Sequence, residues 1–277
     1  MSDRPPDIVL IRPAPAETAL HLSPALLAVA SPLLLLLGWE AVVRLAWLDA
    51  RFFPAPSDVL VALWQMLLTG MLLQHTFWTL QRVLIGFVLG AVPGLLLGLV
   101  MGLSPWVRAF LKPAIAAIYP IPKVALLPLI MMIFGLGEPS KWIIVAIAVF
   151  FQLLLSTIAG VLGIERIYLD VARNLHATRL QAYASVALPG ALPSIFAGCQ
   201  LGLGMALIVV VIAENFGTDA GLGYLVWRSW QVFEVTDMYV GLMMIALLGY
   251  LFQLAMGRLE RRLLRWRPAA TAMKGTP

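Results

Sequence analysis

Few residues of this 277-residue chain have types and spacing that could carry out chemistry. The single cysteine, Cys199, excludes a disulfide within the chain, and the scattered histidines His21, His75 and His176 lack metal-ligand spacing. The sequence has no G-x-x-x-x-G-K-[ST] phosphate loop, and no Ser/His/Asp, Cys/His or paired intramembrane carboxylate pattern. We therefore predict that the chain is not an enzyme and has no catalytic residue, bound cofactor or metal.

Lys123 is the cation whose surroundings most suggest a binding role. It lies in the apolar segment 113–135, which contains Pro113, Pro120, Pro122 and Pro128. Interior prolines bend or break a helix, and a broken helix at membrane depth is tolerated where it lines an aqueous path. We predict that Pro122, Lys123 and, less directly, Gln200 in a later apolar segment line a pathway for an anionic solute. Alternatively, Lys123 reaches a membrane interface and Gln200 ties two helices together.

The composition indicates that the helices carrying these residues lie in a lipid bilayer. The chain is 61% hydrophobic and 12% charged, with a mean hydropathy of +0.93. An apolar run of about 20 residues spans the hydrocarbon core as a helix. Runs of this kind occur at 25–48, 80–103, 112–135, 140–163, 191–214 and 237–258. We predict an all-α membrane protein with six transmembrane helices in a domain covering residues 25–260.

The distribution of arginine and lysine predicts the orientation of these spans. Most of them fall in segments that share one side with both chain ends, and few, such as Arg51, Lys141 and Arg228, fall on the other side. We therefore expect both termini in the cytoplasm, with a disordered tail at 1–24 and a basic tail at 261–277. The net charge of +5 is explained by these flanking arginines, so we predict no nucleic-acid partner.

Small residues recur at helical spacing within two of the spans. Glycine occupies every fourth position from Gly86 to Gly102, and Gly198, Gly202 and Ala206 repeat the pattern later. Such a stripe lets another helix approach closely, so we predict packing within the subunit, with a moving or substrate-lining face as the alternative. Between the first two spans, residues 53–70 predict a short helix on the outer surface, with Ser57 or Asp58 as its N-cap.

The segment 165–190 is a polar, helix-prone loop between two apolar runs. We expect Asp170 near the start of a helix that ends at Leu175, where its charge would complement the helix dipole. His176 interrupts this helix, and Thr178 can cap a second one that stops before Pro189. Two short helices in an elbow at the inner end of the bundle would form a knob for another protein to grip.

This loop resembles the signature of the membrane permeases of bacterial ABC importers. The family pattern of E-A-A, three residues, glycine and a later I-x-L-P is matched by "DVARNLHATRLQAYASVALP". Matching positions are Asp170, Ala172, Ala177, Val186, Leu188 and Pro189. The stretches "FPAPSDV", "TLQRVLIGFVLGAVPGLLLGLVMG", "PIPKVALLPLIMMIFGLGEPSKW" and "AENFGTDAGLGYLVW" resemble the nitrate, sulfonate and taurine branch. The chain departs from the pattern at Asp170, where the family has glutamate, and at His176, where it has glycine.

The resemblance implies a type I importer permease in the bacterial inner membrane, with the loop as the coupling helices. Its contacts with an ATP-binding subunit would come from Asp170, Ala172, Arg173, His176, Ala177, Thr178, Leu188 and Pro189. Glu214 and Asn215 would belong to an outer gate or contact the solute-binding protein. Other partners would be a second copy of the permease and two cytoplasmic ATP-binding subunits, which would hold the ATP and Mg²⁺.

Two other classes of protein fit the sequence less well. A secondary transporter would have inverted repeats and ion-binding polar groups near the midplane, and neither is clear in the sequence. A membrane enzyme would need the catalytic residues that are missing. The solute is expected to be a small oxyanion or sulfonate, although the same branch also serves pyrimidine precursors of thiamine and other organic solutes.

Overall fold

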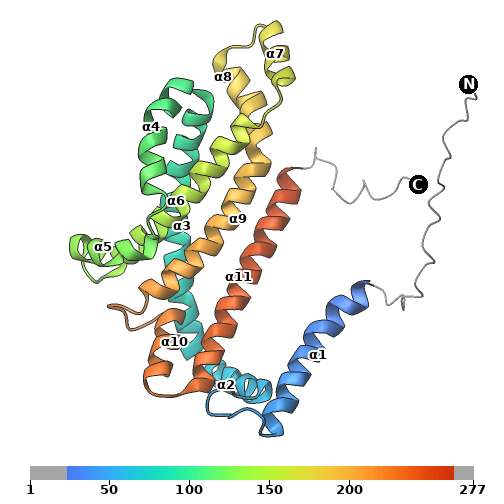
Figure 1. Cartoon of the computed structure of the whole chain (residues 1–277), viewed down its shortest axis with the longest axis vertical. Helices are drawn as coiled ribbons and strands as arrows, with labels where there is room; N and C mark the ends of the chain where they lie inside the picture. The colour runs from blue at the N-terminus through green and yellow to red at the C-terminus, as the bar shows by residue number, and fades with distance from the viewer. Residues whose placement is uncertain (1–23, 265–277) are drawn as a thin grey trace, which may run out of the picture.

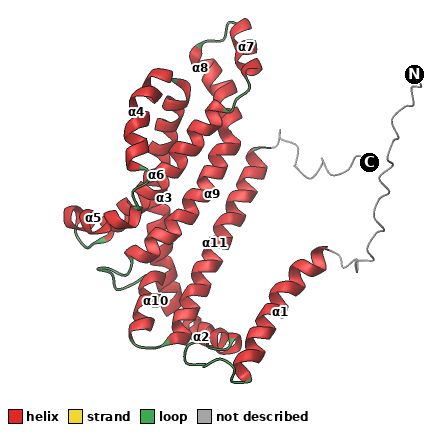
Figure 2. Ribbon diagram, viewed as in Figure 1, coloured by secondary structure: helices red, strands yellow, loops and turns green. Residues whose placement is uncertain are grey.

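The computed structural model describes residues 24–264, and every regular element in that range is helical (Figures 1 and 2). This confirms the all-α prediction for the described part of the chain. The predicted tails lie outside these residues, apart from residue 24 and residues 261–264.

The centre of the molecule consists of three long helices that lie side by side (Figure 1). These are α3 (Met71–Leu103), α6 (Glu138–Leu162) and α9 (Leu188–Ala213), with α6 between the other two. The predicted glycine stripe packs within the subunit, as expected. A Cβ at Gly90 would lie 2.2 Å from the Ala146 carbonyl oxygen, and one at Gly198 would lie 2.6 Å from the Ser156 Cβ. Only glycine lets α3 and α9 approach α6 so closely.

The membrane spans follow most of the predicted segments. Within the described residues, α3, α6, the continuous helical segment Tyr183–Ala213 and α11 (Val235–Leu263) are long and apolar enough to cross a membrane. A fifth span arises if α4 (Pro105–Ile118) is combined with the 3-10 turn η1 (Lys123–Leu126) and α5 (Leu127–Phe134), which are bent by 84°. This break was predicted from the prolines. The first predicted span falls on α1 (Pro24–Arg44) and stays a prediction.

The two ends of the bundle carry different short elements (Figure 1). One end, which we call the elbow end, carries α7 (Arg166–Asn174) and α8 (Arg179–Ala182). The opposite end carries α2 (Pro56–Leu68) and α10 (Leu222–Gln231). α11 runs between these ends and packs against α9, α10 and α2.

Helix α2 is the predicted short helix, but the predicted N-cap is wrong. Pro56 opens the helix and Ala55 is the N-cap residue, because a proline at the first helical position already has the required φ and needs no N–H partner. Ser57 and Asp58 instead accept hydrogen bonds from Arg44 at 2.8 and 2.9 Å. These bonds join α2 to the end of α1.

Candidate functional site: the elbow and a buried ion cluster

The elbow is a turn between α7 and a helix that runs without interruption into the membrane. His176 has φ +54°, so it occupies the left-handed region that the family's glycine would favour. The Ala177 N–H donates to the Ala172 carbonyl at 3.0 Å and closes the turn. The Thr178 hydroxyl accepts from the Gln181 N–H, while the Gln181 side chain accepts from the Thr178 N–H at 2.9 Å. This capping box confirms the predicted role of Thr178.

Two predictions about the elbow are wrong. Asp170 lies in the middle of α7, not near its start, because the helix begins four residues earlier at Arg166. The second helix also does not stop before Pro189. A π-helical segment, η2 (Tyr183–Ala187), joins α8 to α9, and Pro189 lies directly after this segment, in the first turn of α9. The elbow is therefore attached to a membrane span by continuous helix.

Apolar side chains cover the exposed face of the elbow. Ile167, Val171 and Leu175 recur at four-residue spacing with exposures of 62, 50 and 76%. Ala172 is buried, Asp170, His176 and Thr178 are exposed, and Leu188 and Pro189 lie where α9 begins. Arg173 lies in α7, and its side chain is outside the described structure. A patch of apolar side chains of this kind is typical of a protein contact.

The Lys123 side chain folds back and binds carbonyl groups of the preceding backbone. Its Nζ donates to the carbonyls of Tyr119 and Ile121, and it lies 4.6 Å from the centre of the Phe151 ring. Pro122 precedes it as the N-cap of η1. Gln200 lies on another helix pair, where its Nε2 donates to Glu260 Oε2 at 3.2 Å. The described contacts thus do not join Lys123 to Gln200, and their pathway roles remain predictions.

The opposite end of the bundle contains a buried ion cluster that the sequence analysis missed. Arg82 of α3, only 2% exposed, donates two hydrogen bonds to Glu138 at 2.8 and 2.6 Å. Its third nitrogen donates to Glu214 at 2.8 Å and to the Ala220 carbonyl at 2.6 Å. The cluster therefore joins α3, the first residue of α6 and the end of α9 through charge-assisted hydrogen bonds.

Glu214 also closes the start of α10. Its carboxylate is fully buried and accepts from the Thr79 hydroxyl and from the Gly223 N–H, both at 2.8 Å. The Leu222 N–H donates to the Thr79 hydroxyl at 2.7 Å, so the first two amides of α10 both have side-chain partners. A Cβ at Gly221, which has φ +134°, would lie 2.4 Å from the Glu214 carboxyl carbon. The loop before α10 thus packs closely around this carboxylate.

Of the two predicted outer residues, Glu214 is buried inside the subunit and Asn215 is half-buried. The ion cluster encloses Glu214. When the Asn215 amide is oriented to satisfy its hydrogen bonds, its nitrogen donates to the carbonyls of Gly223 and Val211, both at 3.2 Å. Their roles at a gate or a receptor contact remain predictions. The predicted span 80–103 puts Arg82 near its end, whereas α3 begins at Met71 and holds Arg82 well inside the helix. An arginine inside an apolar helix should have indicated a buried partner.

Comparison with known proteins gives the family. Residues 94–265 match the model of the binding-protein-dependent transport system inner membrane component. The chain is 35% identical over 231 residues to the Escherichia coli protein named "Putative aliphatic sulfonates transport permease protein SsuC", covering 83% of this chain and 88% of that protein. It is 34% identical over 237 residues to the Escherichia coli taurine transport system permease protein TauC. This match covers 84% of this chain and 86% of that protein.

A solved structure agrees on the fold. A chain of the inward-facing MetNI methionine ABC transporter superimposes with a TM-score of 0.63 at 21% identity, covering 70% of this chain and 96% of that chain. The matched model, the relatives and the helical arrangement together show that this chain belongs to the family of binding-protein-dependent transport system inner membrane components, with the fold of a type I ABC importer permease.

Proposed function

We propose that this chain is the pore-forming subunit of an ATP-driven importer of a small sulfonate or related oxyanion. Two copies would form the path, two separate cytoplasmic subunits would bind ATP and Mg²⁺, and a solute-binding protein would deliver the cargo. The relatives named for aliphatic sulfonates and taurine support the solute class. The elbow end and both termini would then face the cytoplasm of a bacterial inner membrane.

The observation that carries this proposal is the exposed apolar face of α7, which a tight turn at His176 joins to α8, and α8 is continuous with a membrane span. ATP binding would bring the two ATP-binding subunits together and move the elbows with them. Because α8, η2 and α9 form one helical segment, a displacement of α8 is passed to α9. The path would then open alternately to each side, with ATP favouring one state by binding it more tightly.

The test replaces an exposed residue of the elbow by a charge. Leu175→Glu, at 76% exposure, should abolish co-purification of the ATP-binding subunit and ATP-driven uptake into proteoliposomes. Val232→Glu, at 55% exposure on the opposite end, is the matched control and should retain binding of the ATP-binding subunit. Retained binding in Leu175→Glu would contradict the role of the elbow. Uptake driven by an ion gradient without ATP would instead indicate a secondary transporter.

A further inference from the structure

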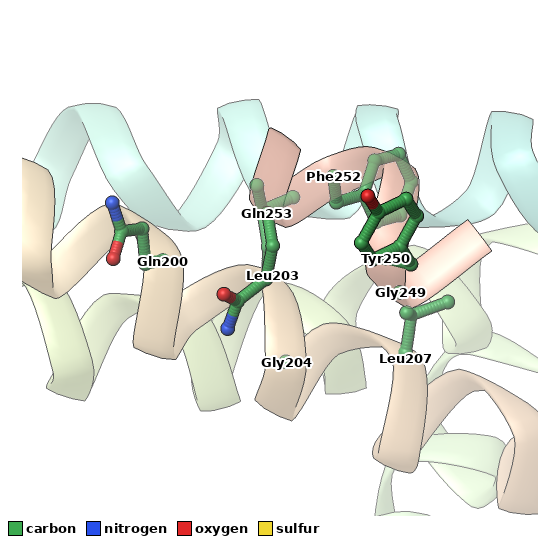
Figure 3. Close-up of a pocket in the computed structure, with 8 residues that line it drawn as sticks. All are labelled: Gln200, Leu203, Gly204, Leu207, Gly249, Tyr250, Phe252 and Gln253. Atoms are coloured by element: carbon green, nitrogen blue, oxygen red, sulfur yellow. The ribbon is translucent and has the colours of Figure 1, made fainter. Parts of the chain in front are cut away.

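A hollow of about 360 Å³ opens between α9 and α11 near the middle of both helices (Figure 3). Leu203, Leu207 and Phe252 form its apolar wall, and Gln200, Tyr250 and Gln253 are its polar side chains. Gln200 lies 12 residues from Leu188 and 13 from Ala213, the two ends of α9. At a rise of 1.5 Å per residue, this is about 18–20 Å from either end of the helix. The hollow therefore lies deep within the spans.

Two glycines keep this space open. A Cβ at Gly204 would have no atom within 4 Å, and one at Gly249 would lie at an ordinary 3.5 Å from Leu207. Both positions could accept a side chain, unlike Gly90, whose added Cβ would overlap α6. Glycine is less favourable than alanine inside a helix. Neither glycine is needed for close helix packing or for a special backbone conformation. What their missing side chains leave is the open volume of the hollow.

The polar groups at the hollow need a partner that lipid cannot supply. Tyr250 is 64% exposed and Gln253 is exposed. Among the described residues, neither the Tyr250 hydroxyl nor the Gln253 amide has a hydrogen-bond partner. Burying such groups unpaired in hydrocarbon is costly, so this face of the subunit is expected to meet water, a polar molecule or protein.

We propose that the hollow is a transit site for the solute, which we take to be an aliphatic sulfonate or a similar organic oxyanion. Tyr250 and Gln253 donate hydrogen bonds to the oxygens of the acid group, and the leucine and phenylalanine side chains contact the apolar tail. This inference rests on the proposed function. None of the described lining residues is a cation, and neutral donors hold an anion loosely enough for it to leave again, as conduction requires.

Glu260 marks the boundary of the proposed site on the side nearer the elbow end. Its carboxylate accepts from the Gln200 amide at 3.2 Å, so that N–H group is already engaged. Glu260 lies seven residues beyond Gln253 along α11, which is about 10 Å of helix. A carboxylate there repels the acid group of the solute, which therefore stays beside Tyr250 and Gln253.

The first experiment measures uptake by proteoliposomes that contain the complete transporter and its solute-binding protein. Tyr250→Phe combined with Gln253→Leu should raise the KM for radiolabelled ethanesulfonate by about 10- to 100-fold, because two hydrogen bonds are lost. Affinity of the solute-binding protein and ATP-subunit binding should not change. Gln65→Leu, at an exposed position of α2, is the matched control with an unchanged KM.

An unchanged KM in the double variant would overturn the transit site alone. Absence of ATP-driven sulfonate uptake by the wild type would overturn the proposed function and the site together.

A second experiment tests access independently of uptake. Cys199 is the only cysteine, so Cys199→Ala with Gly204→Cys places one thiol in the hollow without a clash. The membrane-impermeant reagent 2-sulfonatoethyl methanethiosulfonate should label it, and ethanesulfonate should slow this labelling. Cys199→Ala with Val232→Cys, at 55% exposure on the opposite end of the bundle, is the control and should be labelled without protection by ethanesulfonate. Absence of labelling, or labelling that sulfonate does not slow, would overturn the site. A disulfide between two copies at position 204 would show instead that the second copy covers this face.

Discussion

Arg82 and Glu214 form an ion pair at 2.8 Å between α3 and the end of α9, and their side chains are 2 and 0% exposed. Glu138 completes the cluster, with its carboxylate bonded to the other two nitrogens of the guanidinium. Three helices and the loop before α10 thus meet at one cation. The stability of this end of the bundle should depend on that cation.

Arg82→Ala should destabilise the subunit by about 3–5 kcal/mol, because it leaves a buried carboxylate without its partner. The midpoint of thermal unfolding in detergent, followed by tryptophan fluorescence, measures this loss. Arg51→Ala removes an exposed pair with Asp49 and should leave the midpoint in place. Equal midpoints for both variants would show that the buried cluster contributes nothing.

Gly90→Ala should destabilise the subunit, whereas Gly204→Ala should stabilise it. An added methyl group at Gly90 would lie 2.2 Å from a carbonyl oxygen of α6, and overpacking of this kind costs about 1–3 kcal/mol. At Gly204 the methyl group meets open space, and the better helix propensity of alanine contributes up to about 1 kcal/mol. The same unfolding assay should give shifts of opposite sign. Shifts of equal sign would contradict the predicted contact between α3 and α6.

His176→Gly should retain binding of the ATP-binding subunit, whereas His176→Val should weaken it. Glycine adopts φ +54° without steric cost, but a β-branched residue at this φ is strained and would reshape the turn. Co-purification of the two subunits at increasing salt provides the measurement. Equal binding by the valine variant would show that the turn geometry does not control the contact.

Lys123→Met should destabilise the broken span, and Lys123→Arg should restore most of the loss. The Lys123 ammonium group donates to the carbonyls of Tyr119 and Ile121, which lie beside the prolines at 120 and 122. Removing the donor deletes both hydrogen bonds, each of which should contribute about 0.5–1.5 kcal/mol to stability. If Lys123 also contacts the solute, the arginine variant will show a changed KM for uptake at a normal unfolding temperature. An unaltered KM would limit Lys123 to its structural role.

Sequence alone determined the features that depend on local patterns. Run length and hydropathy predicted the membrane helices, the glycine spacing predicted the face that α3 presents to α6, and prolines predicted the break between α4 and α5. Thr178 was recognisable as a cap because a capping box involves residues only three apart. These signals lie within one or two helical turns, so they can be read without knowing what packs against them.

Only the tertiary structure decided which distant side chains meet. Arg82 and Glu214 are 132 residues apart, and no local pattern marks them as partners. Whether helix continues from α8 into α9 depended on how the π-helical segment accommodates Pro189. The hollow at Gly204 depended on where α11 lies against α9. Short-range propensities set each helix, whereas the cost of leaving a buried charge unpaired favours the arrangement that brings Arg82 and Glu214 together.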